Sequence, residues 1–163
     1  MKAVVVYESL WGNTAAIARA IAEGIGKEAR CLSTLEATPA AVKDAELLVV
    51  GAPVMGFRMP NAKTLASVTP AGSHPADLSH PPMREWLDGL YPAQAKCAAF
   101  DTRVRGPFGN AAKAIAKALE AKGCESVAKP TGFIVTGKYG PLRDGEVEKA
   151  RKWGVELARA AQG

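Results

Sequence analysis

The sequence predicts an α/β protein built on an open, doubly wound sheet of five parallel strands with helices on both faces. Short apolar runs recur along the chain, and each is followed by a stretch in which apolar residues have helical spacing. Runs such as VVVY and LLVV are apolar at successive positions, which is typical of strands buried on both faces of a parallel sheet. Because crossovers between parallel strands are right-handed, the doubly wound arrangement is the default.

The segments between the predicted strands have the periodicity of amphipathic helices. Ile17, Ile21 and Ile25 recur at every fourth position, so they lie on one face of a helix. The same kind of spacing occurs at Ala111, Ile115 and Leu119, and along a last helix at Val147, Ala150, Gly154, Leu157 and Ala161. The predicted strands are residues 2–7, 29–33, 46–52, 96–102 and 132–137.

Residues 60–82 do not follow this alternation. The segment is rich in proline and has little periodicity, so we expect a long connection that leads into a short helix at about residues 83–90. Connections longer than about 15 residues are uncommon in compact domains unless they are functional lids or disordered segments. A surface insertion and a functional lid both remain open for this segment.

The composition indicates one ordinary globular domain over residues 1–163. The chain has a mass of 17.0 kDa, with 48% hydrophobic and 23% charged residues, and no linker or internal repeat divides it. Its three cysteines, Cys31, Cys97 and Cys124, have no CxxC spacing, which predicts reduced, buried and inert thiols. Since Met1 and Lys2 lead directly into a strand and no apolar run is long enough to span a membrane, we expect a cytoplasmic protein without membrane insertion.

The net charge of +5 does not by itself indicate a nucleic-acid-binding protein. The basic residues are dispersed along helix faces, and no aromatic pattern of an RNA- or DNA-binding fold accompanies them. A metal site is also not predicted, because the two histidines and three cysteines show no ligand spacing.

The turn SLWGNT, Ser9–Thr14, lies between the first predicted strand and the first helix. It lacks the lysine of a GxxxxGK[ST] loop, and Gly12 alone cannot supply the three glycines of GxGxxG. It does offer three polar side chains and the free N–H groups of a helix start, which together predict a phosphate site without cations. The alternative that Asn13 or Thr14 merely caps the helix remains open.

Two further loops are expected to meet this turn. Residues 52–60, APVMGFRMP, follow the third strand, and residues 101–109, DTRVRGPFG, follow the fourth. In an open parallel sheet, ligands bind outside the carboxyl ends of the strands, where such loops converge. The three loops therefore form the candidate site.

The segment VVYESLWGNTAAIARAI resembles the flavodoxin fingerprint, in which an aromatic-ended strand is followed by Ser/Thr-x-x-Gly-Asn-Thr and a helix. GAPVMGF and AFDTRVRGPFG resemble the loops on the two sides of the flavin ring. GFIVTGKYGPLRDGEVEKARKWGVELA is similar to the last strand and helix of flavodoxin-like proteins, particularly those of actinobacteria. The resemblance covers nearly the whole chain and implies a flavodoxin-like sheet with strand order 2-1-3-4-5.

The resemblance also implies an FMN site, with neither catalytic residues nor metal ligands. The phosphate would bind at the Ser9–Thr14 turn, and the ring would lie between the other two loops, with Phe57 and Phe108 as candidates for its two faces. The implied cofactor-binding residues are Ser9, Leu10, Trp11, Gly12, Asn13, Thr14, Pro53, Val54, Met55, Gly56, Phe57, Asp101, Thr102, Arg103 and Phe108.

The sequence departs from familiar flavodoxins in three respects. Trp11 replaces the middle hydroxyl residue of the phosphate turn, and the loop after the fourth strand has no tyrosine. Flavodoxin carriers are strongly acidic, whereas this chain is basic and has Arg58, Arg103 and Arg105 in or beside the ring loops. Positive charge near the ring favours reduced, anionic flavin, so we expect a less strongly reducing protein.

The function implied is that of an FMN-binding redox protein that carries electrons between partner proteins, as a monomer or weak dimer. One alternative is an FMN-dependent reductase of quinones or of a porphyrinogen, with residues 60–82 as a roof and His74 or His80 as an acid or base. Another is a flavin-free binding module of the same fold. A phospho-receiver is disfavoured, because Ala52 and Pro53 end the third strand where that family needs an aspartate.

Overall fold

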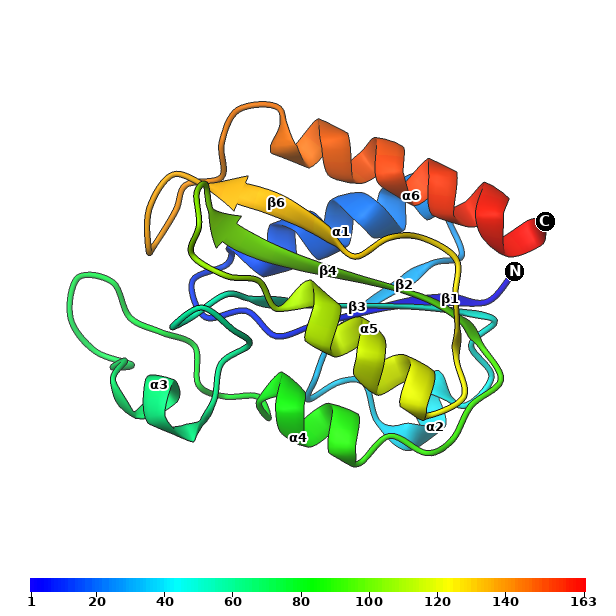
Figure 1. Ribbon diagram of the computed structural model, residues 1–163, viewed down its shortest axis with the longest axis horizontal. Helices are drawn as coiled ribbons and strands as arrows, with labels where there is room; N and C mark the ends of the chain where they lie inside the picture. The colour runs from blue at the N-terminus through cyan, green and yellow to red at the C-terminus, as the bar shows by residue number, and fades with distance from the viewer.

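The computed structural model describes residues 1–163 and shows a central parallel sheet between two layers of helices (Figure 1). The sheet order is β2-β1-β3-β4, and both β5 and β6 pair with β4, so they form one interrupted edge strand. The predicted five parallel strands in the order 2-1-3-4-5 are confirmed, with the two-residue β5 as a small addition. The strands are β1 (Ala3–Tyr7), β2 (Arg30–Ser33), β3 (Leu47–Pro53), β4 (Lys96–Val104), β5 (Glu125–Ser126) and β6 (Thr131–Val135).

Helices α1 and α6 cover one face of the sheet, and α2, α4 and α5 cover the other (Figure 1). The short helix expected near residues 83–90 is present as α4. Helices α2 and α3 were not predicted, because four or five residues make about one turn and show no periodicity. The helices are α1 (Asn13–Ile25), α2 (Pro39–Val42), α3 (Ala62–Ala66), α4 (Met83–Asp88), α5 (Ala112–Ala121) and α6 (Glu146–Gln162).

Two strand ends differ from the prediction by two residues. Strand β4 continues two residues past 102, because Arg103 and Val104 still pair with Ile134 and Val135 of β6. Strand β6 ends at Val135 rather than at residue 137, because the chain turns there and the Thr136 N–H donates to the carbonyl of Pro141. The longer β4 brings Arg103 to the carboxyl edge of the sheet, where the predicted site lies.

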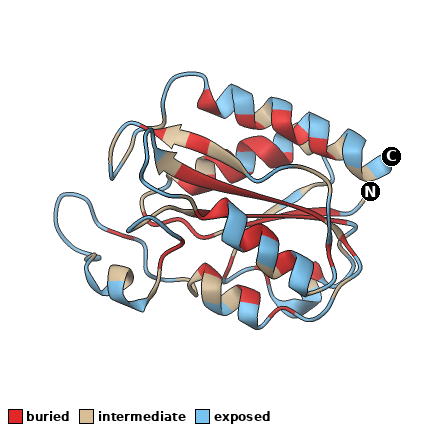
Figure 2. Cartoon of the chain, viewed as in Figure 1, coloured by how far each residue is buried: buried red, intermediate tan, exposed pale blue.

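The continuous apolar runs are explained by burial on both faces of the sheet (Figure 2). Along β1, Val4 and Val6 pack into the cluster under α4 and α5, whereas Val5 packs into the cluster under α1 and α6. Each strand therefore contributes alternate residues to two separate cores, as a covered parallel sheet requires.

The backbones of α1 and α6 approach each other closely at two glycines. A Cβ on Gly154 would clash with the carbonyl of Ile21, and a Cβ on Gly24 would clash with the carbonyl of Arg151. Only glycine fits at positions 24 and 154 without a shift of the two helices. It fixes α1, and with it the turn that precedes α1, relative to the rest of the sheet.

Candidate functional site

A cavity of about 420 Å3 lies at the carboxyl ends of β1, β3 and β4. The three loops that the sequence predicts to converge all contribute to its wall, and α3 and the loop after β6 complete it. The lining residues are Ser9, Leu10, Trp11, Asn13, Thr14, Pro53, Val54, Met55, Gly56, Thr64, Ser67, Thr102, Arg103, Val104, Val135 and Lys138. Of the residues predicted for the site, Gly12, Phe57, Asp101 and Phe108 are not among them.

The Ser9–Thr14 turn presents backbone N–H groups that have no partner in the protein. The N–H groups of Leu10, Trp11, Asn13 and Thr14 donate no hydrogen bond, whereas those of Gly12 and Ala15 donate to the Oγ of Ser9. Gly12 allows this arrangement because the chain bends there with a φ of 93°, a conformation that favours glycine. Free N–H groups at the positive end of a helix dipole form a site for an anion.

The three polar side chains of this turn already have protein partners. The Oγ of Ser9 accepts hydrogen bonds from the N–H groups of Gly12 and Ala15, at 3.1 and 3.2 Å. The Nδ2 of Asn13 donates to the carbonyl of Tyr139, at 3.1 Å. Ser9 therefore stabilises the start of α1, the role that the sequence analysis left open for Asn13 or Thr14, and its own hydroxyl proton remains free to donate.

A buried pair of hydroxyls joins the turn to β4. The Oγ1 atoms of Thr14 and Thr102 lie 2.7 Å apart. Only one of the two hydroxyls donates to the other, so one proton remains for a second acceptor. The pair connects two of the predicted loops directly.

Lys138 is a cation that the sequence analysis did not assign to the site. It lines the cavity, and its Nζ lies 5.9 Å from the centre of the Trp11 ring and 5.5 Å from that of Tyr139. Trp11 and Tyr139 in turn pack edge to face, with ring centres 5.0 Å apart. The position of Lys138 could not be predicted from the local sequence. Its loop reaches the Ser9–Thr14 turn only in the folded chain, where Asn13 bonds to the carbonyl of Tyr139.

Residues 55–58 form a tight turn at the end of β3. The backbone groups of Met55 and Arg58 bond to each other in both directions, at 2.7 and 3.3 Å. Gly56 and Phe57 have φ values of 58° and 72°, which are the signs expected of a type I′ turn. Phenylalanine rarely adopts this conformation. Phe57 is 63% exposed and is not part of the cavity wall.

The loop after β4 is held by a buried carboxylate. Asp101 accepts hydrogen bonds from the N–H groups of Ala111 and Ala112, at 2.8 and 2.9 Å, and so stabilises the start of α5. It also pairs with Arg103, whose guanidinium lies over Gly132, where a Cβ would collide with it. Asp101 is thus an anchor behind the wall. Phe108 lies farther along the loop and is 49% exposed.

No family model matches the sequence, and no curated protein matches it. Solved structures are similar over the full length. A flavodoxin from the domain Archaea has a TM-score of 0.75 at 22% identity, with all of both chains covered. Flavodoxin 1 from Bacillus cereus has a TM-score of 0.68 at 18% identity, with 98% of each chain covered. A short-chain flavodoxin associated with a bacterial microcompartment has a TM-score of 0.70 at 15% identity, with 99% of each chain covered.

The chain has the flavodoxin fold. The resemblance seen in the sequence is thereby confirmed at the level of the fold. In this fold, the carboxyl edge of β1, β3 and β4 is the point where the strand order reverses, which is the usual ligand site of an open α/β sheet. The cavity with the free N–H groups lies at that edge.

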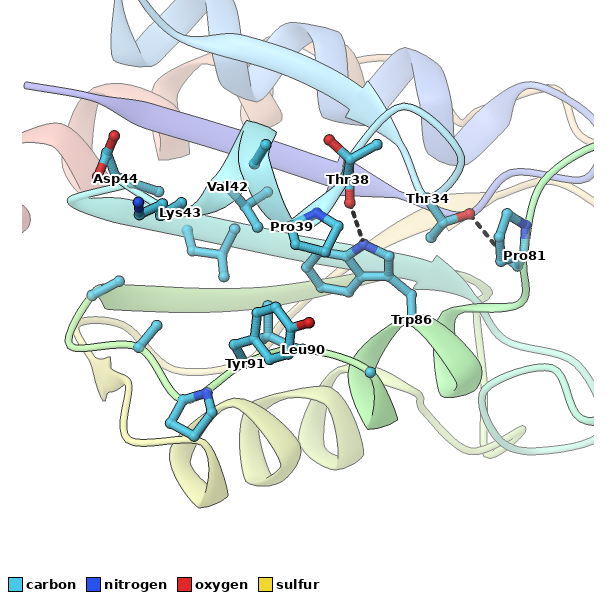
Figure 3. Close-up of a pocket in the computed structure, with 18 of the residues that line it drawn as sticks. Thr34, Thr38, Pro39, Val42, Lys43, Asp44, Pro81, Trp86, Leu90 and Tyr91 are labelled. Carbon is cyan, nitrogen blue, oxygen red and sulfur yellow. Dashed lines mark hydrogen bonds between the residues drawn. The ribbon is translucent and has the colours of Figure 1, made fainter.

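A second and larger cavity of about 800 Å3 lies between α2 and α4 (Figure 3). It exists because α2 is a single turn that cannot cover this part of the flavodoxin-fold sheet. Two of its polar side chains have partners: the Nε1 of Trp86 donates to the carbonyl of Ala37, and the Oγ1 of Thr34 donates to the carbonyl of Pro81. Size alone would favour this cavity, but it lies away from the carboxyl edge of the sheet and from the free N–H groups at the start of α1, so we assign the functional site to the smaller one.

Three thiols lie outside the cavity wall, and the contact with the Cys97 side chain lowers the pKa of Cys124 to about 7. Cys97 and Cys124 are buried and Cys31 is half-buried, and burial raises the pKa of the Cys31 thiol to about 11, so it remains protonated at neutral pH. No three His, Cys, Asp or Glu side chains lie close enough together to hold a metal ion. No helix has both the length and the apolar character needed to cross a membrane.

Proposed function

We propose that this protein binds FMN in the 420 Å3 cavity and carries electrons between partner proteins. The observation that carries the proposal is the set of four free N–H groups at the start of α1, in a turn that lines the cavity. A phosphate is the ligand group that such a site recognises best. The flavodoxin fold supports the same choice, because flavodoxins are among the solved structures similar to the chain.

The residues present fit both ends of the cofactor. At the phosphate end, Lys138 adds a positive charge to the backbone donors. At the ring end, Val54, Met55 and Val104 offer apolar contacts, and the cavity volume falls in the range of roughly 300–1,000 Å3 seen for small-ligand sites. Bound FMN supplies one- and two-electron chemistry at its ring. The protein residues would bind the phosphate, orient the ring and exclude water.

The cavity wall favours a carrier over a reductase. The wall contains neither a carboxylate nor an imidazole, the groups that most often move protons to a substrate. The two histidines proposed for a reductase lie elsewhere: His74 stacks on Tyr139 with ring centres 4.1 Å apart, and His80 bonds to Ser9. Residues 60–82 contribute Thr64 and Ser67 to the wall.

The partner of such a carrier would have an acidic surface. Phe57 and Phe108, on the two loops beside the cavity, are exposed apolar side chains. Arg58 follows Phe57 directly and Arg105 lies three residues before Phe108; both are exposed, and neither forms an ion pair. An apolar surface with unpaired positive charge is suited to transient contact with an acidic protein.

The experiment is reconstitution of flavin-free protein with FMN, followed by reduction and reoxidation. A carrier should give a flavin spectrum that bleaches with dithionite, and it should oxidise NAD(P)H only slowly in the presence of a quinone. The reduced protein should transfer electrons to hexacyanoferrate(III), an anion, at a rate that falls as salt is added. Rapid catalytic NAD(P)H oxidation would favour the reductase, and failure to retain FMN would favour the flavin-free module.

A further inference from the structure

Residues 74–83, which we call the strap, run along the outside of the residues that lead into α1. The strap runs antiparallel to residues 8–11. Its residues 74, 77, 80 and 83 contact residues 11, 10, 9 and 8, respectively. The four hydrogen bonds are Trp11 Nε1 to His74 O (3.1 Å), Asp77 N to Leu10 O (2.8 Å), His80 Nε2 to Ser9 O (2.8 Å) and Met83 N to Glu8 Oε1 (3.0 Å).

Two of these contacts hold the peptide groups that carry free donors. The Ser9 carbonyl and the Leu10 N–H belong to one planar peptide group, and the Leu10 carbonyl and the Trp11 N–H belong to the next. When His80 and Asp77 bind the two carbonyls, the orientation of the two N–H groups is therefore fixed as well. A hydrogen bond to a carbonyl also polarises the peptide and makes its N–H a better donor.

His80 supplies the only side-chain atom of the strap among these four contacts. The Nε2 of His80 lies 2.8 Å from the Ser9 carbonyl oxygen and 3.4 Å from the Ser9 nitrogen. Because a carbonyl oxygen only accepts, the shorter contact requires the proton on Nε2, and the Ser9 N–H then does not bond to this atom. The other ring nitrogen, Nδ1, is buried and has no partner. A buried polar atom without a partner opposes folding, so the imidazole is not explained by packing alone.

We propose that His80 is a positioning residue of the phosphate site. Its Nε2–H holds the Ser9–Leu10 peptide so that the Leu10 N–H is oriented and strengthened for an anion, and the strap thereby sets the preference for phosphate-bearing flavin. The inference rests on the proposed function and adds a role for residues 74–83. It assigns to His80 an action through the peptide, without contact to the ligand.

The test uses three replacements of His80 in the full-length protein. In His80→Gln the amide nitrogen reaches the place of Nε2 and can donate to Ser9. In His80→Asn the amide nitrogen takes the place of Nδ1 and falls short, and His80→Leu has no donor. Leu78→Ala is the matched control, because Leu78 lies in the strap, is exposed and makes none of the four contacts.

We expect His80→Asn and His80→Leu to weaken FMN about tenfold and leave riboflavin unchanged, the loss of one hydrogen bond's contribution to the phosphate site. His80→Gln and Leu78→Ala should retain the FMN preference of the natural protein. Equal losses of FMN and riboflavin affinity in all three His80 variants, with the fold intact by circular dichroism, would overturn the proposal, because a merely structural strap would act on both ligands.

A second measurement separates this inference from the proposed function. Inorganic phosphate is titrated into flavin-free protein while the Leu10 and Trp11 amide signals are followed by NMR. We expect phosphate-dependent shifts in the natural protein and in His80→Gln, and weaker ones in His80→Leu. If the natural protein binds phosphate but not flavin, the proposed function fails and the positioning role stands. Identical shifts in all variants, or none in the natural protein, would contradict the positioning role.

Discussion

Asp101 and Arg103, two residues apart on β4, form a two-pronged ion pair with N–O distances of 2.6 and 2.9 Å. The Asp101 side chain is fully buried, and Arg103 shields it from the cavity side. The positive charge of Arg103 is therefore balanced within the wall. From the sequence, Arg58, Arg103 and Arg105 were all expected to place positive charge near the flavin. In the structure Arg103 is paired, whereas Arg58 and Arg105 form no ion pair.

Replacement of Arg103 should cost stability. In Arg103→Gln the buried carboxylate of Asp101 loses its counter-charge and keeps only the two N–H donors of α5. We expect the free energy of unfolding in urea to fall by about 2 kcal/mol, less than for a fully buried pair because the guanidinium is partly exposed. Arg105→Gln is the control and should change it by less than about 0.5 kcal/mol. Equal effects of the two replacements would show that the pair adds nothing.

Lys138 should act on the phosphate end of the cofactor. Lys138→Gln removes a charge from the cavity wall, and we expect about a threefold to tenfold loss of FMN affinity with little change for riboflavin. The difference between Lys138→Gln and the natural protein should shrink as salt is added. Lys129→Gln, outside the wall, is the control. An equal loss for both flavins would place Lys138 at the ring instead.

The buried carboxyl of Glu8 makes stability depend on pH. Burial raises its pKa to about 6, and the Met83 N–H, His80 and Arg84 offset this only in part. A raised pKa means that folding favours the protonated carboxyl, so its contribution is present below about pH 4.5 and is lost as the pH rises through 6. We expect Glu8→Gln to match the natural protein at pH 4 and to exceed it by about 2 kcal/mol at pH 7.5 in urea unfolding. A difference that does not vary with pH would contradict the assignment.

The close contact of α1 and α6 should not tolerate a side chain. Gly154→Ala places a methyl group against the Ile21 carbonyl, and we expect a loss of about 1–3 kcal/mol in the free energy of unfolding. Gly89→Ala is the matched control, because a Cβ there meets no atom closer than 3.6 Å. A neutral Gly154→Ala would mean that the two helices separate at little cost.

The fold could be predicted from the sequence because its strongest signals are local and repeated. Apolar runs such as VVVY and LLVV predict parallel strands covered on both faces, and the spacing of Ile17, Ile21 and Ile25 predicts a helix. The one-turn helices α2 and α3 leave no such signal. The end of β4 was missed because Arg103 and Val104 are held in the strand by pairing with β6, which is distant in sequence.

The candidate site could be predicted as three loops but not as a set of contacts. The turn residues and the β3 loop were recognisable from their order in the chain. By contrast, the type I′ turn that gives Phe57 its positive φ is not recognisable in the sequence PVMGFRM. Lys138 was not predicted at the site, and His80 was considered only as an acid or base of a reductase. Each reaches the Ser9–Thr14 turn from a distant loop, through contacts that depend on the folded chain.

The relative affinities for FMN and riboflavin are the most direct test of the proposed phosphate site. The two ligands share the flavin ring and differ at the phosphate, so their affinities for flavin-free protein, measured by fluorescence quenching at one salt concentration, isolate the turn before α1. Two or three hydrogen bonds to a charged group, at roughly 1.5 kcal/mol or more each, predict that FMN binds at least about tenfold more tightly than riboflavin. Equal affinities for the two flavins would contradict the assignment of the phosphate to the free N–H groups of Leu10, Trp11, Asn13 and Thr14.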